Sequence, residues 1–148
     1  MPIPELSTEG WLPPGLHEAT LVEVRQRFGR IQRSDVRVHL MRKLEIYAEE
    51  VRNSGIGREL LVDGSFVTSK DEPGDVDCIL VLEPSVGLQG TLSPATYNII
   101  SKRMVRKRHG IDLYAFPAGS ASVKSWIELF SQVKGRPDQM KGLVRIPL

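Results

Sequence analysis

Two apolar segments near the middle of the chain are joined by a short polar connection, and this arrangement restricts the fold more than any other feature. The first segment, residues 59–62, leads into Gly64 and Ser65, and the second, residues 76–82, follows directly after Asp75. Short apolar runs bounded by turn residues are typical of buried strands. The connection is too short for the helical crossover that joins parallel strands. We therefore expect these two strands to be antiparallel and the sheet to be mixed.

The spacing of apolar residues divides the rest of the chain into helices and strands. It predicts helices over residues 17–28, 34–53, 94–108 and 120–133, and further strands over residues 111–116 and 143–146. The longest of these helices has one apolar stripe, which we expect to face the sheet, made of Val36, Leu40, Leu44, Tyr47 and Val51. Its charged residues are expected mostly off that stripe: Arg37, Arg42, Lys43, Glu49 and Glu50.

The length of the chain favours one domain. At 148 residues, without an internal repeat or a linker, it is long enough to bury a core. Residues 1–16 contain four prolines and are expected to be an extended lead-in. We expect an α/β (α+β) domain over residues 1–148, with a helical N-terminal extension over residues 1–55 and a mixed-sheet core over residues 56–148.

Composition excludes several classes of protein. With 41% apolar and 26% charged residues, the chain is neither disordered nor fibrous, and a net charge of +2 does not by itself indicate a nucleic-acid binder. A single cysteine, Cys78, excludes an intramolecular disulfide. No window approaches the roughly 20 apolar residues of a membrane span, and the N-terminus lacks the features of a signal peptide. We expect a cytoplasmic protein.

Asp75 and Asp77 form a candidate cation site. Two residues apart on a strand, their side chains leave the same face, about 6 to 7 Å apart at Cα. Two carboxylates at that spacing can bind one cation, and without one they would repel by about 4 kcal/mol at 4 Å and an effective dielectric near 20. The alternative is that both belong to the turn that follows residues 73–74. The upstream Gly64 and Ser65 favour a site, because a glycine turn with N–H groups and a hydroxyl can hold phosphate oxygens.

Asp112 and the basic residues before it form a second candidate feature. An acidic residue in the otherwise apolar strand over residues 111–116 needs a partner, which is either the aspartate pair or a cation such as Arg103 or Lys107. On a helix, Arg103, Arg106 and Lys107 share a face that can meet a triphosphate or an RNA backbone. Basic residues also suit the solvated C-terminus of a helix, so both readings stay open.

These motifs together resemble a known superfamily. In order and spacing, residues 61–65, 75–80 and 111–113 are similar to the signature of DNA polymerase beta-type nucleotidyltransferases, which is a strand, Gly-Ser, a spacer, Asp-x-Asp on a strand and a later strand aspartate. More narrowly, the chain resembles an uncharacterised bacterial and phage family of nucleotidyltransferase-like proteins over nearly its whole length. The segments that carry this narrower resemblance are Gly-Trp-Leu-Pro-Pro-Gly at residues 10–15, Asp-Gly-Ser-Phe-Val-Thr at 63–68, Glu-Pro-Gly-Asp-Val-Asp at 72–77 and Lys-Gly-Leu-Val-Arg-Ile at 141–146.

The resemblance implies a nucleotidyltransferase core that binds magnesium or manganese and a nucleoside triphosphate (NTP). In such a core Asp75, Asp77 and Asp112 would be the metal ligands and catalytic residues, and Gly64 and Ser65 would hold the triphosphate. The implied reaction transfers a nucleoside monophosphate (NMP) to a hydroxyl group and releases pyrophosphate.

The resemblance also leaves choices open. Minimal, antitoxin-type members carry Ala-Arg-Gly after Gly-Ser, whereas residues 66–70 here end in Lys70, which is either a phosphate ligand or a solvated lysine. Because the chain has little room for an acceptor domain, we expect a macromolecular acceptor, a protein side chain or an RNA end, reached through the basic helix 102–108. The rival function is a non-catalytic nucleotide- or partner-binding module of the same fold, serving regulation, a toxin–antitoxin system or phage defence.

Overall fold

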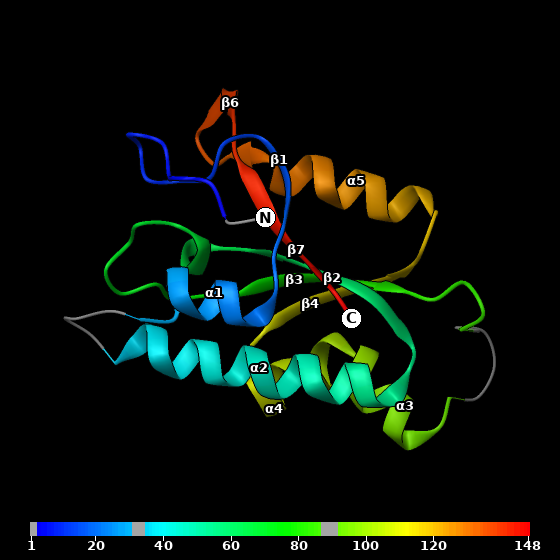
Figure 1. Cartoon of the computed structure of the whole chain (residues 1–148). Helices are drawn as coiled ribbons and strands as arrows, with labels where there is room; N and C mark the ends of the chain where they lie inside the picture. The colour runs from blue at the N-terminus through cyan, green and yellow to red at the C-terminus, as the bar shows by residue number, and fades with distance from the viewer. Residues whose placement is uncertain (1–2, 31–34, 87–91) are drawn as a thin grey trace.

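A mixed five-stranded sheet forms the centre of the computed structural model, which describes residues 3–30, 35–86 and 92–148 (Figure 1). Its strands run in the order β1-β7-β2-β3-β4. Their bounds are β1 (Gly15–Glu18), β2 (Gly57–Asp63), β3 (Asp77–Leu82), β4 (Asp112–Pro117) and β7 (Gly142–Pro147). β2 is antiparallel to both of its neighbours, β3 and β7, whereas β1 with β7 and β3 with β4 are parallel. The antiparallel pairing of the two central strands and the mixed sheet are thus confirmed.

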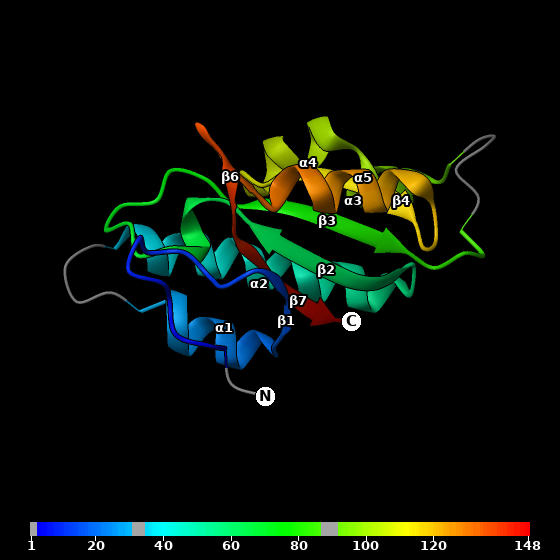
Figure 2. The same ribbon diagram turned by 90° about the horizontal axis from the view of Figure 1, so that it is seen from above.

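The helices cover the two faces of this sheet unequally. Four of the described helices lie on one face: α1 (Leu21–Phe28), α2 (Val36–Ser54), α3 (Pro94–Ile100) and α4 (Lys102–His109). On the other face α5 (Ala121–Phe130) lies over β3 and β4 (Figure 2). A short hairpin of β5 (Gln132–Val133) and β6 (Arg136–Met140) stands apart from the main sheet. Within the described ranges, no helix has the length and apolar character needed to cross a membrane.

The core has two parts because both faces of β2 and β3 are buried. Alternate residues of a strand point to opposite faces. On the face of α1 to α4, Leu60 and Leu80 join the larger apolar cluster, and on the face of α5, Leu61 and Ile79 join the smaller one with Trp126. Burial on both faces explains why these strands are apolar runs rather than alternating patterns.

The N-terminal expectation requires a correction. The helix predicted over residues 17–28 begins at Leu21, because Thr20 forms a capping box with Glu23. In this box each backbone N–H donates to the other residue's side-chain oxygen, both at 3.1 Å. Gly15–Glu18 is instead the strand β1, which pairs with β7. The N-terminal extension, expected to be helical after an extended lead-in, therefore contributes a strand to the sheet.

Two further helix predictions require a correction. The helix expected over residues 94–108 is divided at Ser101, whose side chain accepts from the N–H of Met104 and caps α4. The helix expected over residues 120–133 ends at Phe130, and the hairpin of β5 and β6 follows. The hairpin itself was not predicted, and its placement determines part of the site described below.

The predicted position of the long helix α2 is confirmed, but the expected placement of Arg37 is not. Its first expected residue, at position 34, lies outside the described residues, and the helix begins at Val36. Leu44, Tyr47 and Val51 of the predicted stripe are buried. Arg37, expected mostly off the stripe, is only 1% exposed. This expectation was wrong because the guanidinium has partners outside the helix.

Candidate functional site

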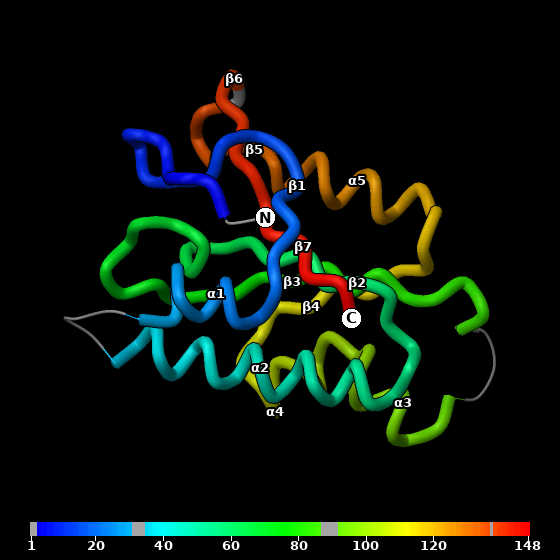
Figure 3. Tube along the Cα trace, in the orientation of Figure 1, coloured from blue at the N-terminus to red at the C-terminus, as the bar shows by residue number. Residues whose placement is uncertain are grey.

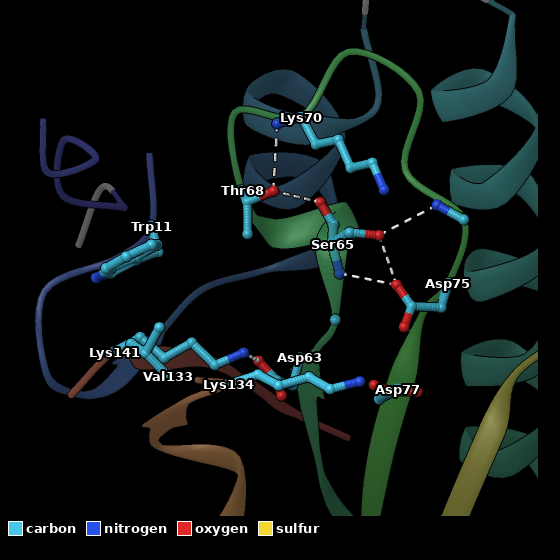
Figure 4. A pocket seen from close by; sticks show the side chains of 12 residues that line it. Trp11, Asp63, Ser65, Thr68, Lys70, Asp75, Asp77, Val133, Lys134 and Lys141 are labelled. Atoms are coloured by element: carbon cyan, nitrogen blue, oxygen red, sulfur yellow. Dashed lines mark hydrogen bonds and ion pairs between the residues drawn. The ribbon is translucent and has the colours of Figure 1, made fainter. Parts of the chain in front are cut away.

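A cavity of about 700 Å³ opens at the ends of the central strands (Figure 4). Five residues of the predicted site line it: Gly64, Ser65, Lys70, Asp75 and Asp77. The rest of the wall consists of Trp11, Asp63, Thr68, Gly74, Val133, Lys134 and Lys141. Asp112 does not line the cavity. The structure therefore brings the Gly-Ser turn and the Asp-x-Asp pair into one concavity, with the third predicted aspartate outside its wall.

Gly64 allows the end of β2 to pass close to the beginning of β3. Its φ of 93° is in a region that residues with a side chain rarely adopt. A Cβ at this position would also be 3.1 Å from the carbonyl oxygen of Asp75 and 3.1 Å from the backbone nitrogen of Asp77. A glycine is therefore required by both the conformation and the space.

Ser65 joins the turn to the first carboxylate of the pair. Its backbone N–H and its hydroxyl both donate to Oδ1 of Asp75, at 2.9 and 2.5 Å. The next two backbone N–H groups are also engaged, Phe66 with the carbonyl of Asp75 and Val67 with the carbonyl of Gly64. The N–H groups that we expected to be exposed for phosphate are thus bonded within the protein. In this structure the turn positions Asp75.

Three lysines supply the positive charge of the cavity wall. Lys70 follows the Gly-Ser turn, whereas Lys134 lies in the turn between β5 and β6, and Lys141 lies between β6 and β7. Figure 4 shows Lys134 extending toward Asp77 and Lys141 bonded to Asp63. Lys134 and Lys141 were not among the predicted site residues, because the hairpin that positions them was not predicted and its first strand, β5, was expected to be helix.

Three aspartates form a row across the sheet. Asp77 on β3 is in register with Asp63 on the antiparallel strand β2 and with Asp112 on the parallel strand β4. Residues directly opposite one another on neighbouring strands share a face of the sheet, so these side chains are neighbours. Asp63, which was not a predicted site residue, is 4% exposed and lies 2.8 Å from Nζ of Lys141.

Repulsion between the carboxylates in this row acts most strongly on Asp77, which lies in the middle. Burial, the negative charges of Asp75, Asp63 and Asp112, and a hydrogen bond with Asp112 raise the pKa of Asp77 to about 7. Burial also raises the pKa of Asp63, although Lys141 opposes the shift. For Asp75 the effect of burial is outweighed by the hydrogen bonds from Ser65 and the nearby lysines, so its pKa is below the ordinary value.

The carboxylate oxygens of Asp75 and Asp77 are ligands of the kind that a divalent cation binds. Magnesium prefers oxygen ligands, and proteins commonly hold it through one or two carboxylates while water and substrate phosphates complete the shell. Asp75 uses one oxygen, Oδ1, for both bonds from Ser65. Across the part of the chain that the structure describes, no group of three His, Cys, Asp or Glu side chains forms a metal cluster. The arrangement therefore fits a cation that is bound partly by these carboxylates and partly by the oxygens of a bound phosphate.

The partner of Asp112 is a basic residue of α4. Its Oδ1 lies 2.6 Å from Nη1 of Arg106, rather than beside the expected Arg103 or Lys107. Another basic residue of this helix, Arg108, makes a two-pronged pair with Glu50 at 2.6 and 2.9 Å. Arg103 and Lys107 are exposed. A contact of this helix with an acceptor stays a prediction.

Arg37 anchors the loop that follows the Gly-Ser turn. Its guanidinium donates to the backbone carbonyls of Phe66, Thr68 and Lys70, and to that of Phe28. These bonds fix the backbone on which Lys70 stands. Charge alone gave no signal for this role, since a lone arginine on an amphipathic helix usually faces solvent.

Over residues 4–147 the chain matches the model of a family of unknown function (DUF6932), and it belongs to that family. No curated protein and no solved structure matches it. The family description carries no activity, so the resemblance to nucleotidyltransferases stays a prediction that rests on the motifs and the site.

Proposed function

We propose that this member of the DUF6932 family is a divalent-cation-dependent nucleotidyltransferase, which transfers an NMP from an NTP to a hydroxyl of a protein or an RNA. One observation carries the proposal: the Gly-Ser turn, the Asp75 and Asp77 carboxylates and three lysines share one cavity. Carboxylates suit a divalent cation, and lysines suit a triphosphate. Both charged parts of a metal–nucleotide complex therefore have counterparts in the wall.

Each group has a proposed task. Asp75 and Asp77 would hold the cation, which when bound would neutralise charge on the phosphates. Lys70, Lys134 and Lys141 would bind phosphate oxygens as point charges. The raised pKa of Asp77 supports the assignment, because a cation between the carboxylates would offset the repulsion that makes its ionised form unfavourable.

The proposed reaction is an in-line displacement at the α-phosphorus. The acceptor hydroxyl oxygen forms a bond to the α-phosphorus, and the bond to the oxygen that bridges to the β-phosphate breaks. Pyrophosphate leaves with the electron pair, and the hydroxyl proton passes to a base. Asp112 is our candidate for the carboxylate on the acceptor side, since it is beside Asp77 in register but outside the cavity wall.

The second candidate function is nucleotide binding without transfer. The ion pair of Asp112 with Arg106 favours it, because a carboxylate engaged by an arginine is less available to an acceptor. In this case the module would regulate a partner according to the nucleotide that it holds.

Thermal unfolding with each of the four NTPs and saturating magnesium tests nucleotide binding. A ligand at 100 times its Kd adds about 2.7 kcal/mol to the folded state, so the melting temperature should rise. Asp77→Asn should remove the increase, and Asp138→Asn, at an exposed position outside the cavity wall, should retain it. If none of the NTPs raises the melting temperature, both candidate functions are wrong.

A transfer assay separates the two candidates. NTPs labelled at the α-phosphate are incubated with the protein, magnesium and a bacterial lysate, and protein and RNA fractions are examined for label. Label that depends on Asp77 supports the transferase. Binding without label on either fraction supports the non-catalytic module.

A further inference from the structure

Trp11 has a fixed position beside the loop that carries Lys70. The N–H of Ser69 donates to the carbonyl of Gly10 at 2.9 Å, and Trp11 forms an isolated antiparallel bridge with Thr68. Gly10 has a φ of 94°, which residues with a side chain rarely adopt, so the approach of the two segments favours a glycine. Figure 3 shows the N-terminal segment at the same end of the molecule as this loop and the β5–β6 hairpin.

The indole presents part of its surface to the cavity. Among the described residues that line the cavity, Trp11 is the only aromatic one. The guanidinium carbon of Arg136 lies 5.9 Å from the ring centroid, but Arg136 does not line the cavity. Trp11 itself is half-buried and lines the cavity. Figure 4 shows Trp11 on one side of the cavity, and Asp75 and Asp77 on the other.

Resting on the proposed function, we propose that the indole of Trp11 is the platform on which the base of the bound nucleotide stacks. A nucleotide whose phosphates lie near the lysines and the Asp75 and Asp77 carboxylates has its base at its opposite end. The indole provides an aromatic surface at that side of the cavity. Stacking on an aromatic side chain accepts every base, and the larger ring area of purines makes purine nucleotides the tighter ligands.

Fluorescence tests the contact directly. The chain has two tryptophans, so Trp126→Phe leaves Trp11 as the only source of tryptophan emission. Trp126 lies on α5, where it packs against Tyr114 and Phe130, and it does not line the cavity. Magnesium with ATP or GTP should quench the emission of Trp126→Phe, whereas magnesium with inorganic tripolyphosphate should not. The matched variant Trp11→Phe, which retains Trp126, should show no quenching by either ligand.

Affinity separates stacking from a structural role. Trp11→Ala should weaken the binding of magnesium–ATP by about 10- to 100-fold and leave the binding of tripolyphosphate unchanged, and Trp11→Phe should restore most of the loss. Trp11→Ala binding ATP within twofold of the wild type would overturn the inference while leaving the proposed function intact. Equal losses for ATP and tripolyphosphate would also overturn it, since they would indicate a collapsed site. A wild-type protein that binds neither ligand would overturn the proposed function and the inference together.

Discussion

Asp77 and Asp112 occupy the same register position on the parallel strands β3 and β4. Asp63 is opposite Asp77 on its other side, in β2. The two outer aspartates have cations of their own, Lys141 at 2.8 Å and Arg106 at 2.6 Å. Among the described residues, no cation forms an ion pair with Asp77. A cation from solution would therefore offset more charge repulsion at Asp77 than at Asp63 or Asp112.

The raised pKa of Asp77 makes a prediction about stability and pH. In the folded protein this carboxyl binds its proton more tightly than in the unfolded chain, with a pKa of about 7 instead of 3.8. The contribution of Asp77 to the free energy of unfolding should consequently fall as the pH rises from about 4 to about 7, and then level off. Asp77→Asn removes this loss, so the variant should exceed the wild type by about 1 kcal/mol at pH 8, after allowance for solvent screening, and match it near pH 4.

Urea unfolding at several pH values measures this difference. Asp138→Asn, at an exposed position, serves as the control and should follow the wild type throughout. A constant difference between Asp77→Asn and the wild type at every pH would contradict the crowding of charges in the row.

Gly64 and Gly74 provide a matched pair of substitutions in the connection between β2 and β3. Gly64→Ala should destabilise the protein by about 1 to 3 kcal/mol, because it imposes a left-handed conformation on alanine and brings a Cβ to 3.1 Å from two backbone atoms. Gly74→Ala should be nearly neutral, since nothing lies within 4 Å of the added Cβ. Equal unfolding free energies of the two variants in urea would disprove the close approach of β2 and β3 at Gly64.

The central strands and the two motifs between them could be predicted because their signals are local. Apolar runs, turn residues and a connection too short for a helix together determine that β2 and β3 are antiparallel neighbours. The same locality places Ser65 beside Asp75, since both lie at the ends of these strands. The strands and motifs are joined by one short connection, in which Ser65 and Asp75 are ten positions apart.

The missed residues depend on contacts between distant parts of the chain. Lys141 reaches Asp63 across 78 positions, and its approach depends on a hairpin with no apolar run of its own. Asp63 was given no role in the predicted site, because its register with Asp77 is visible only once the strands are paired. The burial of Arg37 was not predicted, because carbonyl acceptors in a distant loop leave no pattern in the sequence.

Arg37 should therefore matter more to stability than the other arginines of α2. Arg37→Ala removes the donors that satisfy the carbonyls of Phe66, Thr68 and Lys70, and should cost about 3 kcal/mol or more. The control is Arg42→Ala on the same helix, an exposed position whose substitution should change the unfolding free energy by less than about 0.5 kcal/mol. Similar small losses for both variants in urea unfolding would mean that the loop does not depend on Arg37.

A substitution at Asp112 should distinguish the chemical step from nucleotide binding. It lies beside Asp77 in register, yet it does not line the cavity that we assign to the nucleotide. Asp112→Asn should consequently leave the Kd for magnesium–NTP within a few fold of the wild type. If Asp112 acts on the acceptor side, transfer should fall by about a thousandfold or more, because an interaction made mainly in the transition state affects turnover far more than binding.

The control for Asp112→Asn is Glu50→Gln, which also removes an ion pair with an arginine of α4 but is not part of the aspartate row. Glu50→Gln should retain both binding and transfer. This comparison excludes the possibility that any loss of activity arises merely from loosening α4. Transfer by Asp112→Asn at the wild-type rate would remove Asp112 from the mechanism. A parallel loss of NTP affinity and transfer would instead place Asp112 in nucleotide binding, because substrate and transition state would then lose the same interaction.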